Sequence, residues 1–344
     1  MRAVSYAEHG VLPTVGSWPD PVCPPGGVVV RVGATGVCRS DWHAWMGHDR
    51  VPLPHVPGHE LAGTVDAVGR DVRRWSVGDR VTVPFVCGCG TCSWCRAGDT
   101  HVCPRQTQPG FTGPGSFAEL VAVRAADTNL VALPDGLDAV TAASLGCRLA
   151  TAFRALVTHG RVGPGDWVAV HGCGGVGLSA VLVAVALGAR VAAVDVSAGA
   201  AHRALELGAT EAVLDPDPAR AVHDLTGGGA HVSLDAVGTP ATARASVRSL
   251  RRRGRHVQVG LLLGRDATPP LPMDLVVAHE LEIHGSHGMP AHQYVDLLRL
   301  VVDGTLDPGM LVGRVIGLEE APAALAAMSG PGTTAGMTVV RLPS

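Results

Sequence analysis

The chain has 344 residues and no lysine; 47% of the residues are hydrophobic, 17% are charged, and the net charge is −3. This length suits two domains, the small net charge argues against a nucleic-acid-binding surface, and the missing lysine excludes Schiff-base chemistry. The first ten residues lack an apolar signal sequence, and the longest apolar region, 180–196, is interrupted by Gly188 and Arg190, so we expect a cytoplasmic protein with no membrane partner.

Short valine-rich segments separated by glycine and proline dominate the first third of the chain. Such segments favour strands, and turn sequences such as Val77-Gly78-Asp79 separate them. We therefore predict a compact β domain, with strands at Val28–Val32, Gly63–Val68 and Arg80–Val83.

Five of the nine cysteines lie between positions 87 and 103. Four of them follow the pattern C-x2-C-x2-C-x7-C, in which each C-x-x-C pair turns two thiolates onto one ion. Four thiolates complete the tetrahedral shell of Zn²⁺, so we predict a structural zinc that stabilises an irregular loop. Reduced cysteines without a metal are the alternative, which this crowding disfavours. The predicted ligands are Cys89, Cys92, Cys95 and Cys103, with Cys87 as a spare thiol.

The sequence changes near position 140, where a long helix is predicted at Ala139–His159. Strands and helices then alternate, which indicates a doubly wound parallel sheet, and six strands fit a complete dinucleotide-binding fold. The Arg251–Arg253 triplet is expected at a solvated helix end. The predicted strands are Trp167–His171, Arg190–Val194, Glu211–Leu214, Val232–Asp235, Arg255–Val259 and Leu281–His284, and the predicted helices are Gly175–Leu187 and Ala200–Leu207. The tail adds a helix at Gln293–Val302 and a strand at Met337–Arg341.

A glycine-rich turn follows the first of these strands. The pattern G-x-G-x-x-G is weak alone, but here it links a predicted strand to a predicted helix, where the helix N-terminus faces the phosphates of a dinucleotide. Asp195 ends the next strand, and a carboxylate there binds ribose hydroxyls and repels a 2′-phosphate, which favours NAD over NADP. The turn contains Gly172, Gly174, Gly175, Val176 and Gly177.

A second group of metal-ligand residues is spread along the chain. Cys38 follows a predicted strand, His59 lies in Pro57-Gly58-His59-Glu60, and Cys147 lies in the predicted long helix. Two thiolates and one imidazole leave the fourth position of Zn²⁺ free for a substrate oxygen, and this ligand set is already known from the catalytic zinc of alcohol dehydrogenases. Asp41 and Glu60 are candidate carboxylates for orienting His59 or the metal, and Glu60 is also counted with Cys38, His59 and Cys147 among the residues of the catalytic zinc site. Each residue alone is more often structural; their combination favours a catalytic zinc.

Together these features resemble the zinc-containing medium-chain dehydrogenase/reductase family, in particular its alcohol dehydrogenases, over essentially the whole chain. The matching stretches are Gly36–Asp41, Pro57–Gly69, Cys87–Cys103 and Gly172–Gly177 with Asp195. The resemblance implies an α/β protein with a GroES-like, β-rich catalytic domain at 1–148 and 286–344 and an inserted Rossmann domain at 149–285. It also implies an active site between the domains and a homo-oligomer, a tetramer or a dimer.

The resemblance implies roles for four further residues. Ser40 matches the hydroxyl that touches the zinc-bound alcohol oxygen, and His43 matches the end of a proton relay to solvent. Arg39 matches a pyrophosphate contact, and Thr151 matches a nicotinamide contact. The alternatives are a turn hydrogen bond for Ser40 and surface positions for Arg39 and His43.

Two positions depart from the family pattern. Many relatives carry a Gly-Arg pair before the last strand that helps bind the pyrophosphate, whereas this chain has Gly336-Met337. We therefore expect cofactor affinity to depend more on Arg39 and the helix N-terminus. Arg148 follows Cys147 where smaller residues are frequent, and is expected either at the domain interface or in a pocket for a polar substrate.

These residues predict a zinc-dependent enzyme that transfers hydride reversibly between a primary or secondary alcohol and NAD through a zinc-bound alkoxide. Apolar side chains near the catalytic positions favour simple or aryl alcohols over polyols. The alternatives are a polyol or L-threonine dehydrogenase, a zinc-free quinone or enoyl reductase that uses NADPH, and a non-catalytic zinc- and nucleotide-binding protein. Cys147 argues against a polyol enzyme, and the zinc motifs argue against the reductase. Core packing is the alternative for each of the candidate channel residues, which are Trp42, Trp45, Phe85 and Leu149.

Overall fold

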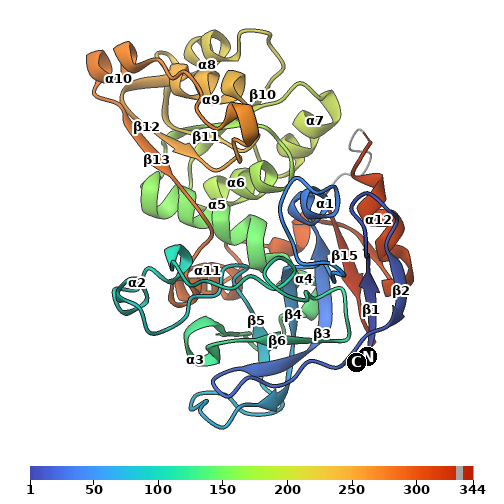
Figure 1. Ribbon diagram of the computed structural model, residues 1–344. Coiled ribbons are helices and arrows are strands. Elements are labelled where there is room, and N and C mark those ends of the chain that lie inside the picture. The colour runs from blue at the N-terminus through green and yellow to red at the C-terminus, as the bar shows by residue number, and fades with distance from the viewer. Residues whose placement is uncertain (331–335, 344) are drawn as a thin grey trace. The chain divides into compact units, whose positions relative to one another are not determined.

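The computed structural model describes residues 1–330 and 336–343. The chain forms two compact units, and Figure 1 shows their elements. The first unit comprises Met1–Ala150, Gly288–Val302 and Asp307–Ser344, and the second comprises Thr151–His287 and Asp303–Leu306. Within the described residues, no helix is both long and apolar enough to cross a membrane.

A seven-stranded sheet organises the first unit. Its strand order is β14-β15-β3-β4-β5-β7, and β6 also pairs with β3. The long strand β3 is buried along almost its whole length because it pairs with β4, β6 and β15. The strands are β3 Val28–Val37, β4 Glu60–Val68, β5 Arg80–Thr82, β6 Leu120–Val123, β7 Val131–Ala132, β14 Val312–Ile316 and β15 Met337–Arg341, and a separate pair is formed by β1 Arg2–Ser5 and β2 Thr14–Ser17.

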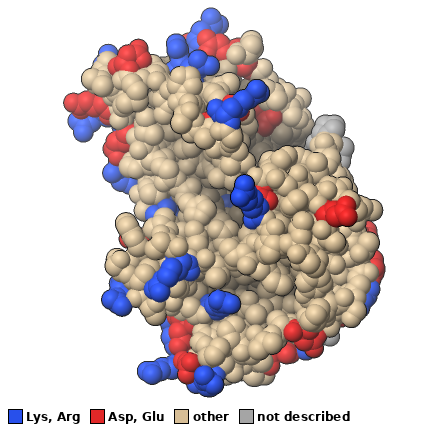
Figure 2. Space-filling model, in the orientation of Figure 1, with Lys and Arg blue, Asp and Glu red and all other residues tan. Residues whose placement is uncertain are grey.

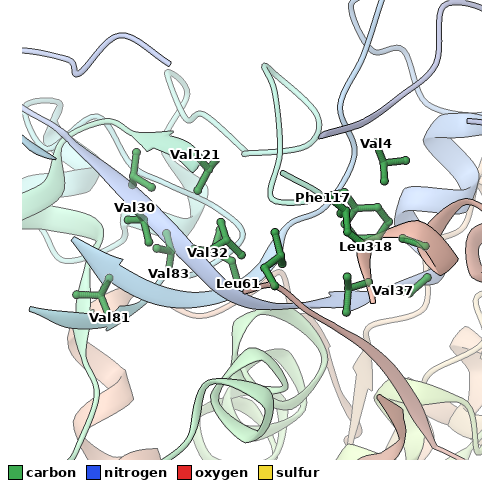
Figure 3. Close-up of a cluster of buried hydrophobic side chains, with 14 of the residues drawn as sticks. Val4, Val30, Val32, Val37, Leu61, Val81, Val83, Phe117, Val121 and Leu318 are labelled. Atoms are coloured by element: carbon green, nitrogen blue, oxygen red, sulfur yellow. The ribbon is translucent and has the colours of Figure 1, made fainter. Parts of the chain in front are cut away.

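Valine and leucine side chains from these strands form the core of the first unit. Figure 3 shows Val30, Val32 and Leu61 from β3 and β4 beside Val81 and Val83, with Phe117 and Leu318 in the same cluster. Every side chain labelled in Figure 3 is buried. The apolar pattern that predicted a β domain is therefore the pattern that this core buries.

Short helices complete the first unit, and one long helical segment continues from it into the second unit, which begins at Thr151. The predicted helix Ala139–His159 is interrupted by two π-helical turns, Leu145–Leu149 and Ala155–His159, between α4 Ala139–Ala143 and α5 Ala150–Arg154. Such widened turns often occur at functional sites, and the first of them carries Cys147. The other helices are α1 Arg39–Trp45, α2 Ser93–Arg96, α3 Ala126–Asn129, α11 Tyr294–Val302 and α12 Ala321–Ala327.

A six-stranded parallel sheet forms the centre of the second unit. Its strand order, β10-β9-β8-β11-β12-β13, is the doubly wound 3-2-1-4-5-6 arrangement, so the sequence-based prediction of a dinucleotide-binding fold is confirmed. The order reverses between β8 and β11, where ligands of such sheets bind beyond the carboxyl ends of the strands. The strands are β8 Trp167–His171, β9 Arg190–Val194, β10 Glu211–Val213, β11 Ala230–Asp235, β12 Leu250–Gln258 and β13 Glu282–Gly285.

Three helices of the second unit were not predicted. Two of them begin with proline after a capping residue: the side chain of Asp217 accepts from the Arg220 amide, and that of Thr239 accepts from the Thr242 amide. This N-cap and proline pattern is a sequence signal for a helix start. The helices are α6 Gly175–Ala186, α7 Ala198–Glu206, α8 Pro218–Thr226, α9 Pro240–Arg248 and α10 Met273–His279.

The Arg251–Arg253 triplet does not end a helix, so that expectation was wrong. It lies within β12, and all three side chains are exposed. The pairing of β11 with β12 shifts register here, between Ala230 and Val232, and Arg253 has a φ of 60°. The strand therefore begins earlier than the predicted strand Arg255–Val259, and its first part carries exposed arginines beside a register shift. Elsewhere on the surface, arginine and acidic side chains are interspersed on the face shown in Figure 2.

A buried polar network lies in the second unit beside the sheet. His171 Nε2 is 3.1 Å from Ser249 Oγ, and His256 Nδ1 is 3.0 Å from Ser246 Oγ. Burial lowers the pKa of His171 to about 3 and that of His256 to about 4. Both imidazoles are therefore neutral in the folded protein near neutral pH. In the unfolded chain they take up a proton already below about pH 6.5, the ordinary pKa of histidine.

This network predicts acid destabilisation of the protein. The pKa values of both histidines in the folded protein lie below the unfolded value of about 6.5. The free energy of unfolding is therefore highest above that pH and falls as the pH drops towards 4. Each histidine should account for a loss of about 1–2 kcal/mol between pH 6.5 and 5. We expect the double variant H171Q/H256Q to lose less stability than the wild type over this range in denaturant titrations. H202Q, at an exposed histidine, is the control and should behave like the wild type. Equal pH dependence in all three proteins would contradict this assignment.

Candidate metal and cofactor sites

One buried carboxylate connects the two segments that carry the first metal-ligand residues. Asp41 Oδ2 accepts from the backbone amide of Cys38 at 3.1 Å, which caps helix α1. Its other oxygen, Oδ1, accepts from the Gly58 amide at 3.0 Å and lies 2.8 Å from His59 Nδ1. Asp41 therefore fixes the start of α1 and the loop before β4 relative to each other.

The same contact sets the tautomer of His59. A carboxylate only accepts, so Nδ1 carries a proton, and in the neutral imidazole, which is the form that binds a metal, Nε2 presents a lone pair. His59 Nε2 is buried and has no hydrogen-bond partner among the residues that the structure describes. Its neighbours are Cys38 Sγ, Cys147 Sγ and a Glu60 oxygen, and these donor atoms all lie within 4.8 Å of one another. A buried lone pair beside two thiols fits a zinc ion, which would satisfy it.

The ionisable groups of this site shift each other's pKa values. The hydrogen bond with Cys147 and the nearby His59 lower the pKa of Cys38, and the same bond and burial raise the pKa of Cys147. Burial alone would lower the pKa of His59, but Asp41 and Cys38 raise it above its usual value. Without metal, the cluster therefore retains protons that a divalent ion displaces on binding.

The π-helical turn Leu145–Leu149 brings Cys147 to this cluster. Tyr294 of α11 stabilises the turn, because its hydroxyl donates a hydrogen bond to the Leu145 carbonyl at 3.2 Å. Arg148, the next residue after Cys147, is buried against Glu60. Arg148 therefore pairs with Glu60 beside the metal-ligand cluster, within its own unit.

Helix α1 places the expected substrate and cofactor contacts next to Cys38. Ser40 Oγ lies 3.9 Å from Cys38 Sγ, and His43 Nδ1 lies 2.9 Å from His48 Nδ1. Burial and the neighbouring His48 lower the pKa of His43, so its imidazole is neutral and able to accept a proton. The Arg39 guanidinium stacks on Trp42 and donates to the Met328 carbonyl.

The four-cysteine loop has the geometry of a closed metal site. Cys92 Sγ lies 3.6 Å from Cys103 Sγ, and Cys89 Sγ lies 4.0 Å from Cys95 Sγ. A zinc tetrahedron with bonds of about 2.3 Å has sulfur–sulfur edges of about 3.8 Å, so the spacing fits. Cys87 lies apart from this group: its thiol donates to the Pro84 carbonyl, and burial raises its pKa to about 12.

The glycine-rich turn lies in the second unit between β8 and α6. Gly172 has a φ of 94°, and a side chain at Gly177 would reach within 1.7 Å of the Gly172 carbonyl oxygen, so glycine is required at both positions. Gly174 is the N-cap of α6, and Gly175 and Val176 form its first turn. The free amides there make an anion site.

Asp195 is held at the end of β9 by this turn. Its Oδ2 accepts from the Cys173 amide at 2.6 Å, and its Oδ1 accepts from the Ser197 amide at 2.8 Å. The sequence placed Asp195 near the turn through its spacing but did not indicate these contacts. Thr151 lies in α5 at the start of the second unit.

Two phenylalanines flank the His59 ring. Phe85 lies with its ring centroid 6.1 Å from that of His59, and Phe111 lies at 5.1 Å. Of the candidate channel residues, Trp45 instead belongs to the core, where its indole donates to the Val11 carbonyl. Phe111 was missed because it lies in a loop whose glycines and prolines give no periodic pattern.

The chain matches known families along most of its length. Residues 24–135 match the alcohol dehydrogenase GroES-like domain, and residues 175–303 match the zinc-binding dehydrogenase domain. An alcohol dehydrogenase of Geobacillus stearothermophilus is 36% identical over 76% of each chain. Among solved structures, the alcohol dehydrogenase TADH from Thermus sp. ATN1 superposes with a TM-score of 0.92 at 32% identity, and an NAD-dependent alcohol dehydrogenase with a TM-score of 0.89 at 32% identity; each covers 100% of both chains.

These matches define the class of the protein. The chain is a zinc-binding oxidoreductase with a GroES-like and a Rossmann-type domain. It belongs to the alcohol dehydrogenases of the zinc-containing medium-chain dehydrogenase/reductase family, so the resemblance drawn from its motifs is confirmed.

The contacts of Asp41 predict a metal-binding defect without loss of a ligand. The variant D41N cannot accept at both oxygens, so His59 loses its fixed orientation and zinc retention against a chelator should fall about tenfold to a hundredfold. The zinc held by the four-cysteine loop should remain. D66N, at a partly exposed carboxylate paired with Arg31, is the control and should keep both metals. Unchanged retention in D41N would contradict the role of Asp41.

Proposed function

We propose that the protein oxidises a primary or secondary alcohol to an aldehyde or ketone with NAD⁺ and catalyses the reverse reduction. The buried lone pair of His59 Nε2 between two thiols is the observation that carries the proposal, because it fits a divalent ion with three protein ligands. Cys38, His59 and Cys147 would hold the catalytic zinc, and Cys89, Cys92, Cys95 and Cys103 would hold a second, structural zinc. The catalytic ion would lower the pKa of the substrate hydroxyl and polarise the carbonyl product.

The chain's own residues account for the movement of the proton and the hydride. Alcohol oxidation releases a proton from the hydroxyl and a hydride from the carbon that bears it. We assign the Ser40 hydroxyl, next to Cys38, to the substrate oxygen and its proton. His43, with its lowered pKa, would accept that proton and pass it to solvent, assisted by His48. The hydride would go to the nicotinamide, with Thr151 as a contact to its ring.

The cofactor assignment follows from the turn after β8. The amides at the start of α6 and the glycine positions would accept the pyrophosphate, with Arg39 as a further contact. Asp195 is fixed by two backbone amides, so its carboxylate stands ready for ribose hydroxyls and would repel a 2′-phosphate. These contacts support NAD over NADP.

The substrate side of the site is expected to be apolar. Phe85 and Phe111 flank His59, which supports simple or aryl alcohols over polyols or L-threonine. Phe111 therefore joins Phe85 as a candidate for the lining of the substrate site. As in the family, we expect the active enzyme to be a homo-oligomer.

Steady-state assays of NAD⁺ and NADP⁺ reduction with alcohols, polyols and L-threonine test the proposal. We expect NAD⁺-dependent turnover of simple or aryl alcohols, loss of at least about a hundredfold in C38A, and little change in C23A, whose thiol lies away from both metal sites. Turnover confined to polyols or L-threonine would replace the substrate class. Zinc-loaded protein without turnover in either direction would favour a non-catalytic zinc- and nucleotide-binding protein.

A further inference from the structure

The catalytic metal cluster contains a fourth donor that the proposed mechanism does not use. A Glu60 oxygen lies within 4.8 Å of the donor atoms of Cys38, His59 and Cys147. Four protein ligands close a tetrahedral zinc site, whereas three leave a position for substrate. This inference rests on the proposed function, because it concerns what keeps that site open.

Arg148 donates hydrogen bonds to both carboxylate oxygens of Glu60. Its Nε donates to Glu60 Oε1 at 3.0 Å, its backbone amide donates to the same oxygen at 3.2 Å, and its Nη2 donates to Oε2. The same Nη2 also lies 3.3 Å from the Val37 carbonyl oxygen. The carboxylate is therefore held in two places by a rigid, planar group.

The surrounding backbone leaves little room for another arrangement. A Cβ at Gly36 would lie 2.3 Å from Glu60 Oε2 and 3.1 Å from Arg148 Nη2, so glycine is needed where the ion pair packs against β3. Glu60 is fully buried and Arg148 nearly so. Because solvent does not reach the pair, each charge depends on the other for compensation.

The position of Arg148 in the chain ties this pair to the metal ligands. Glu60 directly follows His59, and Arg148 directly follows Cys147. The ion pair therefore connects the backbone positions next to two of the proposed ligands. Two cysteines and two carboxylates lie close together here, and Arg148 supplies a buried positive charge next to them.

We infer that Arg148 is a positioning residue that holds Glu60 off the metal and so keeps one zinc position open for substrate. Without the hydrogen bonds of Arg148, the buried Glu60 carboxylate would have no other positive charge as close as the metal ion, so it would bind the ion. The centre then acquires four protein ligands, as in the four-cysteine site, and becomes structural in character.

Imidazole binding to protein with Co²⁺ in the catalytic site tests this inference without turnover. The visible d–d bands of cobalt report its ligands, so a titration gives the affinity of the open position. We expect R148M to bind imidazole at least about tenfold more weakly than the wild type, with bands altered before any imidazole is added. The double variant E60Q/R148M should recover wild-type affinity, because no carboxylate remains to close the site.

Two further variants control for folding and charge. R148K keeps the positive charge but cannot bond both carboxylate oxygens in the same way, and should bind imidazole with reduced affinity. R31M removes a partly exposed arginine of an ion pair in the same unit and should match the wild type. Wild-type affinity and bands in both R148M and R148K would overturn the role of Arg148. Failure of the wild type itself to bind imidazole would instead remove the open position and the proposed function with it.

Discussion

The carboxylate of Asp41 is the contact on which the metal site depends. One oxygen caps α1 at Cys38, and the other holds the loop at Gly58 and the ring of His59. A single buried group thus fixes two ligands that lie 21 positions apart in sequence, and it selects the tautomer that presents Nε2. The buried sheet around β3 and β4 makes this possible, because α1 follows β3 and His59 precedes β4.

The two candidate metal sites of the first unit differ in how their ligands are supplied. The four cysteines come from one short loop, and their thiols contact one another and nearby backbone amides. Cys38, His59 and Cys147 come from three separate segments. Asp41 positions the segments of Cys38 and His59. Tyr294 and the Glu60–Arg148 ion pair position the segment of Cys147. A local loop suits a stabilising ion, whereas a site assembled from distant segments can leave a position for chemistry.

Much of this arrangement was visible in the sequence, and the exceptions have physical reasons. The valine-rich strands, the glycine turn with Asp195 and the cysteine spacing are local patterns, so the fold and family followed from them. The broken helix around Cys147 did not, since the segment is rich in alanine and leucine and its apolar pattern does not mark where one π-helical turn begins. The partner of Arg148 was also hidden, because Glu60 lies 88 residues earlier and only the folded sheet brings them together. For Trp45 the sequence left channel lining and core packing open, and its side chain packs in the core.

Anomalous scattering from crystals of the zinc-loaded protein, measured on both sides of the zinc absorption edge, tests the central claim most directly. The account predicts two zinc peaks per chain. One should lie among the four thiols of the cysteine loop, and the other should lie within bonding distance of Cys38 Sγ, His59 Nε2 and Cys147 Sγ, with Glu60 still paired to Arg148. A peak in the cysteine loop alone, or a second zinc bound by the Glu60 carboxylate in the unliganded wild type, would contradict the account.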